Sequence, residues 1–164
     1  MTLTLTTLRF RDPATYLMSA LFIIGNIVMP QLFHLIPNGG ATWRPIYFFT
    51  LIGSYIYGWR VGLLTALLSP VINSFFFIMP PVAALPAIML KSSLLAVIAG
   101  LTASRFRHTS LLLLIAVVLG YQTVGTLGEW IMKGSLILAC QDFRMGIPGM
   151  LLQIIGGYLI IPRR

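Results

Sequence analysis

The stretch LPAIMLKSSLLAVIAGL, residues 85–101, decides the fold of this chain. All of its residues are apolar or small except Lys91, and a run of this length and composition is typical of a helix that crosses a membrane. Charged residues at such a depth are rare unless they face a partner, a cavity or a ligand. Lys91 is therefore the first candidate for a functional site.

The composition of the whole chain indicates a lipid environment. Of its 164 residues, 58% are hydrophobic and 9% are charged, whereas a water-soluble surface needs roughly a quarter of its residues charged. At about 20 residues per membrane-spanning helix, the chain has room for about six helices. We therefore predict an all-α polytopic membrane protein with six transmembrane helices, in which residues 1–164 form a single integral membrane domain.

Proline, glycine and charged residues divide the chain into six apolar segments. Pro37-Asn38-Gly39-Gly40 ends the first segment and Pro80-Pro81 ends the third, in which the Ser69-Pro70 pair predicts a kink. The second and the sixth segments are short for helices that span a bilayer. The predicted spans cover residues 14–36, 45–57, 61–79, 85–103, 111–132 and 147–161.

The distribution of basic residues predicts the orientation. The net charge of +8 would also suit a nucleic-acid-binding protein, but the basic residues lie scattered at predicted helix ends, so we expect lipid and no nucleic acid as their partner. Six spans place both termini on one side, and the excess of Lys and Arg in the short loops of that side predicts cytoplasmic termini. Arg9, Arg11, Arg60, Arg105, Arg107, Arg163 and Arg164 fall on the terminal side, and Arg44, Lys133 and Arg144 fall on the other.

Polar side chains of five predicted helices collect in the outer half of the membrane. The inner halves of the spans are nearly all Leu, Ile, Val, Ala and Gly, whereas a channel would need polar residues along its whole length. The pattern therefore predicts a solute pocket that opens to the outside. The candidate substrate-binding residues are Arg44, Tyr47, Asn73, Lys91, Glu129 and Gln153.

Four of these candidates also have a structural interpretation. Tyr47 could belong to the aromatic belt at the membrane interface. Lys91 could extend its ammonium to the outer headgroups, because it lies only about two turns from the start of its helix. Glu129 could pair with Lys133 four residues later on the same helix. Asn73 could satisfy a backbone carbonyl that Pro70 leaves without a hydrogen-bond donor. The prediction of a pocket depends on the convergence of all six residues.

Enzymatic and metal-dependent functions find little support in the sequence. His34 and His108 lie near opposite membrane faces and Cys140 is the only cysteine, so we expect no metal site and no cofactor. A membrane enzyme acting on a lipid or isoprenoid would need clustered carboxylates or histidines, and the acidic residues are few and dispersed, so we expect no catalytic residues. A structural subunit of a membrane complex is a further alternative. The acidic residues are Asp12, Glu129 and Asp142.

Several short motifs carry a resemblance to a known family. They are TWRPIY (42–47), GWRVG (58–62), LTALLSP (64–70), IMPP (78–81), LP (85–86) and GIPGMLLQ (146–153). Together they extend over about half of the chain, and they resemble the substrate-binding S components of energy-coupling factor (ECF) transporters, which are bacterial vitamin-uptake proteins. The resemblance implies a six-helix S-component-like bundle in the bacterial cytoplasmic membrane.

The resemblance also implies a division of labour between chains. An S component captures a vitamin outside, docks on a transmembrane coupling subunit and topples to release its load inside, driven by two ATPases on separate chains. In agreement, this sequence has no G-x-x-x-x-G-K-[ST] phosphate loop of its own. The first helix of the family docks through small residues, so we predict the coupling-subunit contact at Thr15, Ser19 and Gly25.

Two expectations concern the solute itself. On the predicted outer side, four basic residues stand against two acidic ones, and this excess favours an anionic, vitamin-like solute. The loop from Pro37 to Thr42 contains Gly39-Gly40, whose backbone freedom suits a lid over the pocket.

Overall fold

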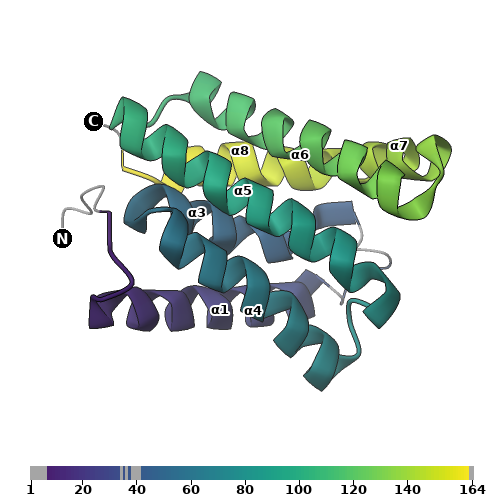
Figure 1. Cartoon of the computed structure of the whole chain (residues 1–164), viewed down its shortest axis with the longest axis horizontal. Helices are drawn as coiled ribbons and strands as arrows, with labels where there is room; N and C mark the ends of the chain where they lie inside the picture. Colours follow the sequence, from purple (N-terminus) through teal and green to yellow (C-terminus); the bar gives the residue numbers. More distant parts are fainter. Residues whose placement is uncertain (1–6, 34, 36, 38–41, 163–164) are drawn as a thin grey trace.

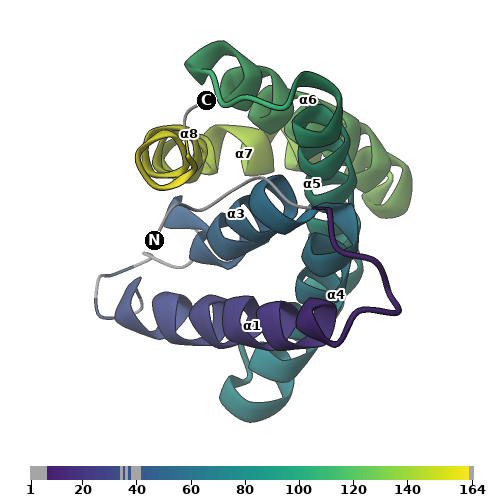
Figure 2. The same cartoon turned by 90° about the vertical axis from the view of Figure 1, so that its left-hand side faces the viewer.

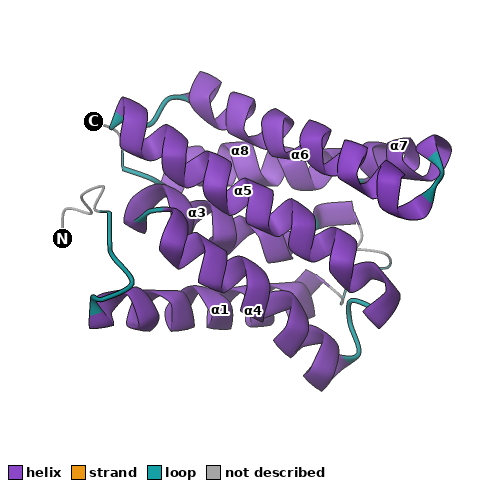
Figure 3. Ribbon diagram, in the orientation of Figure 1, coloured by secondary structure: helices purple, strands orange, loops and turns teal. Residues whose placement is uncertain are grey.

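The computed structural model of the chain describes residues 7–33, 35, 37 and 42–162. These ranges hold helices and loops but no strand (Figures 1 and 3). The helices are α1 (Pro13–Phe33), η1 (Pro45–Tyr47), α3 (Phe48–Tyr57), α4 (Trp59–Phe77), η2 (Val82–Ala84), α5 (Leu85–Phe106), α6 (Leu111–Lys133), α7 (Leu136–Met145) and α8 (Ile147–Ile160). The prediction of an all-α fold is thus confirmed for the described chain.

Proline and left-handed residues mark the ends of the helices. Pro13, Pro86 and Pro148 each lie in a first helical turn, where the missing N–H costs nothing because that group has no partner within the helix. Arg107 and Gly134 follow α5 and α6 in the left-handed conformation, and their N–H groups bond back to carbonyls of the last turn. Local sequence therefore explains where these helices begin and end.

The short helix α3 lies at the centre of the bundle. Eight of its ten residues are buried, and it packs against α1, α4, α5 and α8. Figure 2 shows α3 between α1 on one side and α7 and α8 on the other. An apolar helix of this length is too short to span a bilayer, but it suits the core of a bundle whose neighbours cover it on all sides.

The outer surface of the bundle is apolar. Large hydrophobic side chains are exposed along the long helices, among them Leu17 on α1, Phe75 on α4, Leu112 and Ile131 on α6, and Leu159 on α8. Exposed apolar area on this scale marks contact with something other than water. Four helical segments are long and apolar enough to cross a membrane, and α7 and α8, bent by 46°, could together form a fifth span. The chain is therefore a multi-pass membrane protein.

The structure revises the number of full-length spans. The helices agree closely with the six predicted segments, yet only four or five segments satisfy the length and composition expected of a membrane span. The second predicted span, residues 45–57, consists of η1 and the buried α3, and α8 alone has 14 residues. Six complete transmembrane helices are thus not confirmed. The sequence analysis also missed α7, because Gln141, Asp142 and Arg144 interrupt its apolar pattern.

The two ends of the bundle differ in character. The terminal end, defined by residues 9–13, 57–60, 105–111 and 160–162, contains the start of α1 and the end of α8 (Figure 1). The cavity end, defined by residues 44–47, 77–87 and 129–147, contains the opposite ends of the long helices. Apolar side chains fill the space toward the terminal end, among them Leu51, Tyr55, Leu95, Leu114 and Val118, all of which are buried.

Candidate solute-binding site

The cavity end encloses a cavity of about 740 Å³. Volumes between about 300 and 1,000 Å³ are usual for small-molecule sites. Most of its wall is apolar, formed by Pro30, Pro37, Pro45, Ile46, Met79, Pro80, Pro81, Ala84, Ala87, Ile88 and Met145. Its polar lining residues are Gln31, Arg44, Tyr47, Asn73, Lys91, Glu129, Lys133 and Asp142. A small molecule with an apolar body and a polar group fits this combination.

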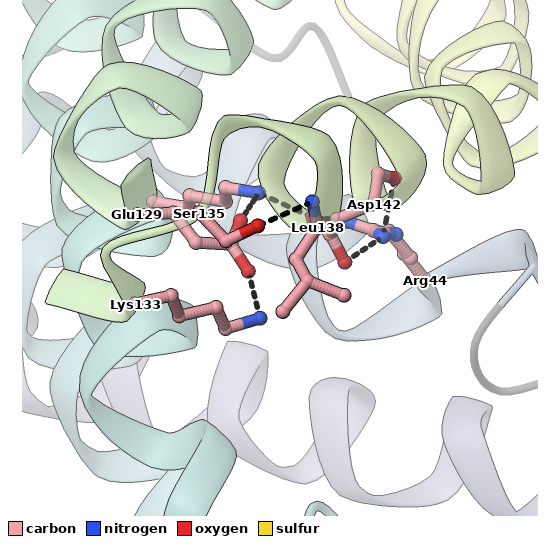
Figure 4. A network of polar contacts seen from close by, with 7 residues as sticks. Arg44, Glu129, Lys133, Ser135, Leu138 and Asp142 are labelled. Atoms are coloured by element: carbon pink, nitrogen blue, oxygen red, sulfur yellow. Dashed lines mark hydrogen bonds and ion pairs between the residues drawn. The ribbon is translucent and has the colours of Figure 1, made fainter. Parts of the chain in front are cut away.

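Five charged side chains form a continuous chain of ion pairs in the cavity wall. Lys91 Nζ lies 2.5 Å from Glu129 Oε2 and also contacts Asp142 Oδ2. The second oxygen of each carboxylate holds another cation: Glu129 Oε1 contacts Lys133, and Asp142 Oδ1 lies 2.5 Å from an Arg44 guanidinium nitrogen. Figure 4 shows the Arg44–Asp142 and Glu129–Lys133 pairs. We refer to Arg44, Asp142, Lys91, Glu129 and Lys133, in this order, as the charge chain.

The centre of the charge chain is buried and its ends are more open. The side chains of Lys91 and Glu129 are each 2% exposed, whereas that of Lys133 is 41% exposed. The Lys91 ammonium therefore does not extend to the membrane surface but lies between two carboxylates. Burying a charge in a medium of low dielectric constant is costly unless an opposite charge compensates it. The alternating order of the charge chain provides this compensation for both buried groups.

Glycine in α6 makes room for the Lys91 side chain. A Cβ atom at Gly125 would lie 2.6 Å from Lys91 Cγ, so the lysine side chain packs directly against the α6 backbone. Gly125, Glu129 and Lys133 follow one another at intervals of four residues and thus share one face of α6. This face brings Glu129 to the Lys91 ammonium.

Arg44 joins the cavity wall to α7. Its backbone is left-handed, with φ 45° and ψ 50°, a conformation that is uncommon for residues other than glycine. The guanidinium donates hydrogen bonds to both carboxylate oxygens of Asp142 and, at 2.8 Å, to its main-chain carbonyl. Gly146 and Gly149 permit this approach, because a Cβ at these positions would lie 2.9 Å from Arg44 Nε and 2.5 Å from the Trp43 carbonyl oxygen, respectively. The GIPG motif thus positions Arg44.

Asn73 has a structural role at the cavity wall. Its Nδ2 donates to the carbonyl oxygens of Asn26 at 3.0 Å and of Ser69 at 3.1 Å. Asn26 O is the carbonyl that Pro30 leaves without a donor four residues later in α1. Asn73 therefore supplies a hydrogen-bond donor to the carbonyl that Pro30 of the neighbouring α1 leaves without one. The sequence had suggested this role toward a carbonyl freed by Pro70. Asn73 Oδ1 is buried and has no hydrogen-bond partner among the described residues.

The structure brings together five of the six predicted binding residues. Arg44, Tyr47, Asn73, Lys91 and Glu129 all line the cavity. Gln153 does not line it; it is buried between α6 and α8, where its Oε1 accepts a hydrogen bond of 3.0 Å from the Tyr121 hydroxyl.

The sequence analysis omitted Asp142 and Lys133 from the candidate set, although both belong to the charge chain. The signal that could have identified them is the scarcity of acidic residues. With only three in the chain, each carboxylate at the predicted outer side was a candidate partner for a buried lysine.

The residues predicted to contact a coupling subunit have internal contacts. Thr15 and Ser19 are buried; the Ser19 hydroxyl donates to the Thr15 carbonyl, and Val61 O of α4 lies 3.4 Å away. Gly25 packs against the Phe49 ring. Both side chains are thus buried within the chain, and their predicted contact with a coupling subunit stays a prediction. Of the predicted lid, Asn38, Gly39, Gly40 and Ala41 lie outside the described residues.

The fold and the site together define the chain as a multi-pass helical membrane protein with a charged cavity at the end opposite to its described termini. Comparisons with protein-family models, with characterised proteins and with solved structures give no match to this chain.

Proposed function

We propose that this chain is the membrane-embedded substrate-binding subunit of an ECF-type importer. It would capture a vitamin or a related small solute at the cavity end and deliver it after docking on a separate coupling subunit with two ATPases. The observation that carries this proposal is the buried charge chain in the wall of a cavity of about 740 Å³. The motifs TWRPIY, LTALLSP and GIPGMLLQ support the choice of family.

The positions of the motif residues agree with a binding role. Arg44 and Tyr47 of TWRPIY line the cavity, and Gly146 and Gly149 of GIPGMLLQ make room for Arg44 and Trp43. Ser69 of LTALLSP accepts a hydrogen bond from Asn73, which also lines the cavity. The quoted motifs thus build the cavity wall and its supports, as expected if they serve solute binding.

The character of the terminal end favours a binding subunit over a channel. Toward the terminal end, the residues of α5 that are buried after Ser92 are Leu95, Ala96, Ala99, Gly100 and Ala103, and none of them has a polar side chain. Solute could not pass through this packing without rearrangement, because conduction needs a path lined by polar groups. A binding subunit that releases its load by reorienting in the membrane requires no such path.

Purification of the tagged chain from its native host tests this function. We expect a transmembrane coupling subunit and two ATPases to co-purify, and mass spectrometry of the denatured sample to detect a retained small molecule. Deleting the gene should then reduce cellular uptake of that molecule. Co-purification with a lipid-modifying complex, or turnover of a lipid by the isolated chain, would contradict the proposal and favour the enzyme or the structural subunit.

A further inference from the structure

We infer that the cavity takes a small amphipathic monocarboxylate, whose negative group binds at Lys133 and whose body lies against the apolar wall. This inference rests on the proposed function, because it names the class of solute for the same site. It follows from which hydrogen-bonding atoms of the charge chain are occupied and which are available.

Each carboxylate oxygen of the charge chain already contacts a cation of the protein. Glu129 Oε1 and Oε2 contact Lys133 and Lys91, and Asp142 Oδ1 and Oδ2 contact Arg44 and Lys91. All four oxygens thus have a cation as partner. A positively charged solute would have to share an oxygen with one of these cations and would raise the positive charge of a largely buried site, which is unfavourable.

Lys133, by contrast, has hydrogen-bonding capacity to spare. An ammonium group carries three N–H donors, and the structure pairs Lys133 Nζ with a single acceptor, Glu129 Oε1. Its side chain is 41% exposed and lines the cavity. Lys91 Nζ also has a third donor, but its side chain is only 2% exposed. Lys133 is therefore the more accessible of the two ammonium groups for an anion.

The charge balance of the lining favours a single negative charge. The charge chain contains three cations and two carboxylates, a sum of +1. One added carboxylate brings the sum to zero and extends the alternating order by one member. A phosphate monoester carries about −1.5 to −2 charges near neutral pH and would leave the site negative. A low-dielectric surrounding penalises such an excess.

The remaining wall defines the body of the solute. Met79, Pro80, Pro81, Ala87 and Ile88 present apolar surface to the cavity. Surface of this kind binds an aromatic or aliphatic group by excluding water from both partners. A molecule with one carboxylate on an apolar body is thus complementary to the two parts of the wall.

Four probes that share a phenyl ring test the charge preference. Benzoate, benzamide, phenyl phosphate and benzylammonium carry different charges on similar bodies, and isothermal titration calorimetry measures their affinities for the purified chain in detergent. We expect benzoate to bind about tenfold or more tightly than benzamide, since it gains a charge-assisted hydrogen bond. Phenyl phosphate should bind more weakly than benzoate, and benzylammonium should bind least.

Variants locate the preference at Lys133. Lys133→Met should abolish the difference between benzoate and benzamide, and Lys133→Arg, which keeps the charge, should restore it. Arg105→Met, an exposed cation in the last turn of α5 at the terminal end, serves as the matched control and should leave the preference unchanged.

The inference is overturned if benzamide or benzylammonium binds as tightly as benzoate, if no probe binds saturably, or if Lys133→Met keeps the preference. Its failure is distinguishable from failure of the proposed function. If the chain co-purifies with a coupling module but retains a neutral or cationic molecule, the proposed function stands and the inference is refuted. If the chain prefers benzoate but co-purifies with no coupling module, the inferred site stands and the proposed importer function is refuted.

Discussion

The cavity end and the terminal end are built from the same helices but are stabilised differently. On α5, Lys91 and its ion pairs lie at the cavity end, while Leu95, Ala99 and Ala103 pack tightly one to three turns further on. Lipid tails are as apolar as a protein core, so apolar side chains gain little by leaving lipid, and the terminal end depends on close packing. The cavity end depends on compensation of buried charges.

Because of this difference, substitutions at the two ends should affect the stability of the fold and the binding of solute to different extents. A substitution at the terminal end removes packing contacts far from the solute and should lower stability alone. A substitution in the charge chain alters both, in proportion to how deeply the group is buried.

Lys91→Met should cause the largest loss. The variant keeps an apolar stem but leaves Glu129 and Asp142 each with one cation fewer, and breaking a buried pair costs about 3–5 kcal/mol. Thermal and denaturant unfolding in detergent measure the loss. Affinity for the retained solute should also fall, by about tenfold or more, because the charge chain then sums to zero and no longer compensates an added anion. Lys91→Arg, which keeps the charge, should be less affected. A stable Lys91→Met variant with unchanged affinity would remove Lys91 from the site.

The double variant Lys91→Met with Glu129→Gln is the control for this experiment. It removes the carboxylate that the single variant leaves undercompensated, so it should be more stable than Lys91→Met alone. An additive loss of the two single effects would show that Lys91 and Glu129 do not interact.

Leu114→Ala should affect the terminal end without affecting the site. Leu114 of α6 is fully buried in the apolar core, and Leu→Ala substitutions in packed cores cost about 2–5 kcal/mol. We expect the lower part of this range, because the removed methyl groups lose packing but little transfer free energy in lipid. Calorimetric affinity for the retained solute should equal that of the wild type. A parallel loss of affinity would show that the two ends are coupled.

Gly125→Ala should have a smaller effect, confined to the contact between α5 and α6. The added methyl group would lie 2.6 Å from Lys91 Cγ, and inserting a group into a packed site costs about 1–3 kcal/mol. Gly120→Ala on the same helix is the matched control, because nothing lies within 4 Å of a Cβ there. The free energy of unfolding should be clearly lower for Gly125→Ala than for Gly120→Ala. Equal stability would show that Lys91 can move aside freely.

The sequence predicted how deep a residue lies along its helix better than it predicted which way its side chain points around the helix axis. A rise of 1.5 Å per residue placed Lys91, Glu129 and Asn73 at similar depth, and all three line one cavity. Gln153 was placed at the same depth but turns toward Tyr121. In a soluble protein, the apolar stripe of a helix reveals which face is buried. In lipid both faces are apolar, so this signal is weak.

The same lack of a directional signal applies to α1. Thr15 and Ser19 were predicted to contact a coupling subunit because of their small size, and small residues serve equally well in contacts within one chain. Here both are buried, Ser19 lies against α4, and the Thr15 hydroxyl donates to the Arg9 carbonyl. Asp142 was overlooked for a different reason. It lies in the short helix α7, and only the tertiary structure brings that helix to Arg44 and Lys91.

Lys133→Met should change stability least and yet matter most for the comparison of the two ends. Lys133 pairs with Glu129 four residues earlier, and its side chain is 41% exposed, so loss of this pair should cost only about 0.3–0.5 kcal/mol. Glu129 keeps Lys91 as its buried partner. Chemical unfolding of Lys133→Met, of Lys91→Met and of the terminal-end control Arg105→Met measures how the loss in free energy of unfolding grows with the burial of the substituted side chain. If Lys133→Met were as destabilising as Lys91→Met, the charge chain would act as one cooperative unit, and no member of it could release its partner to a solute without loss of the fold.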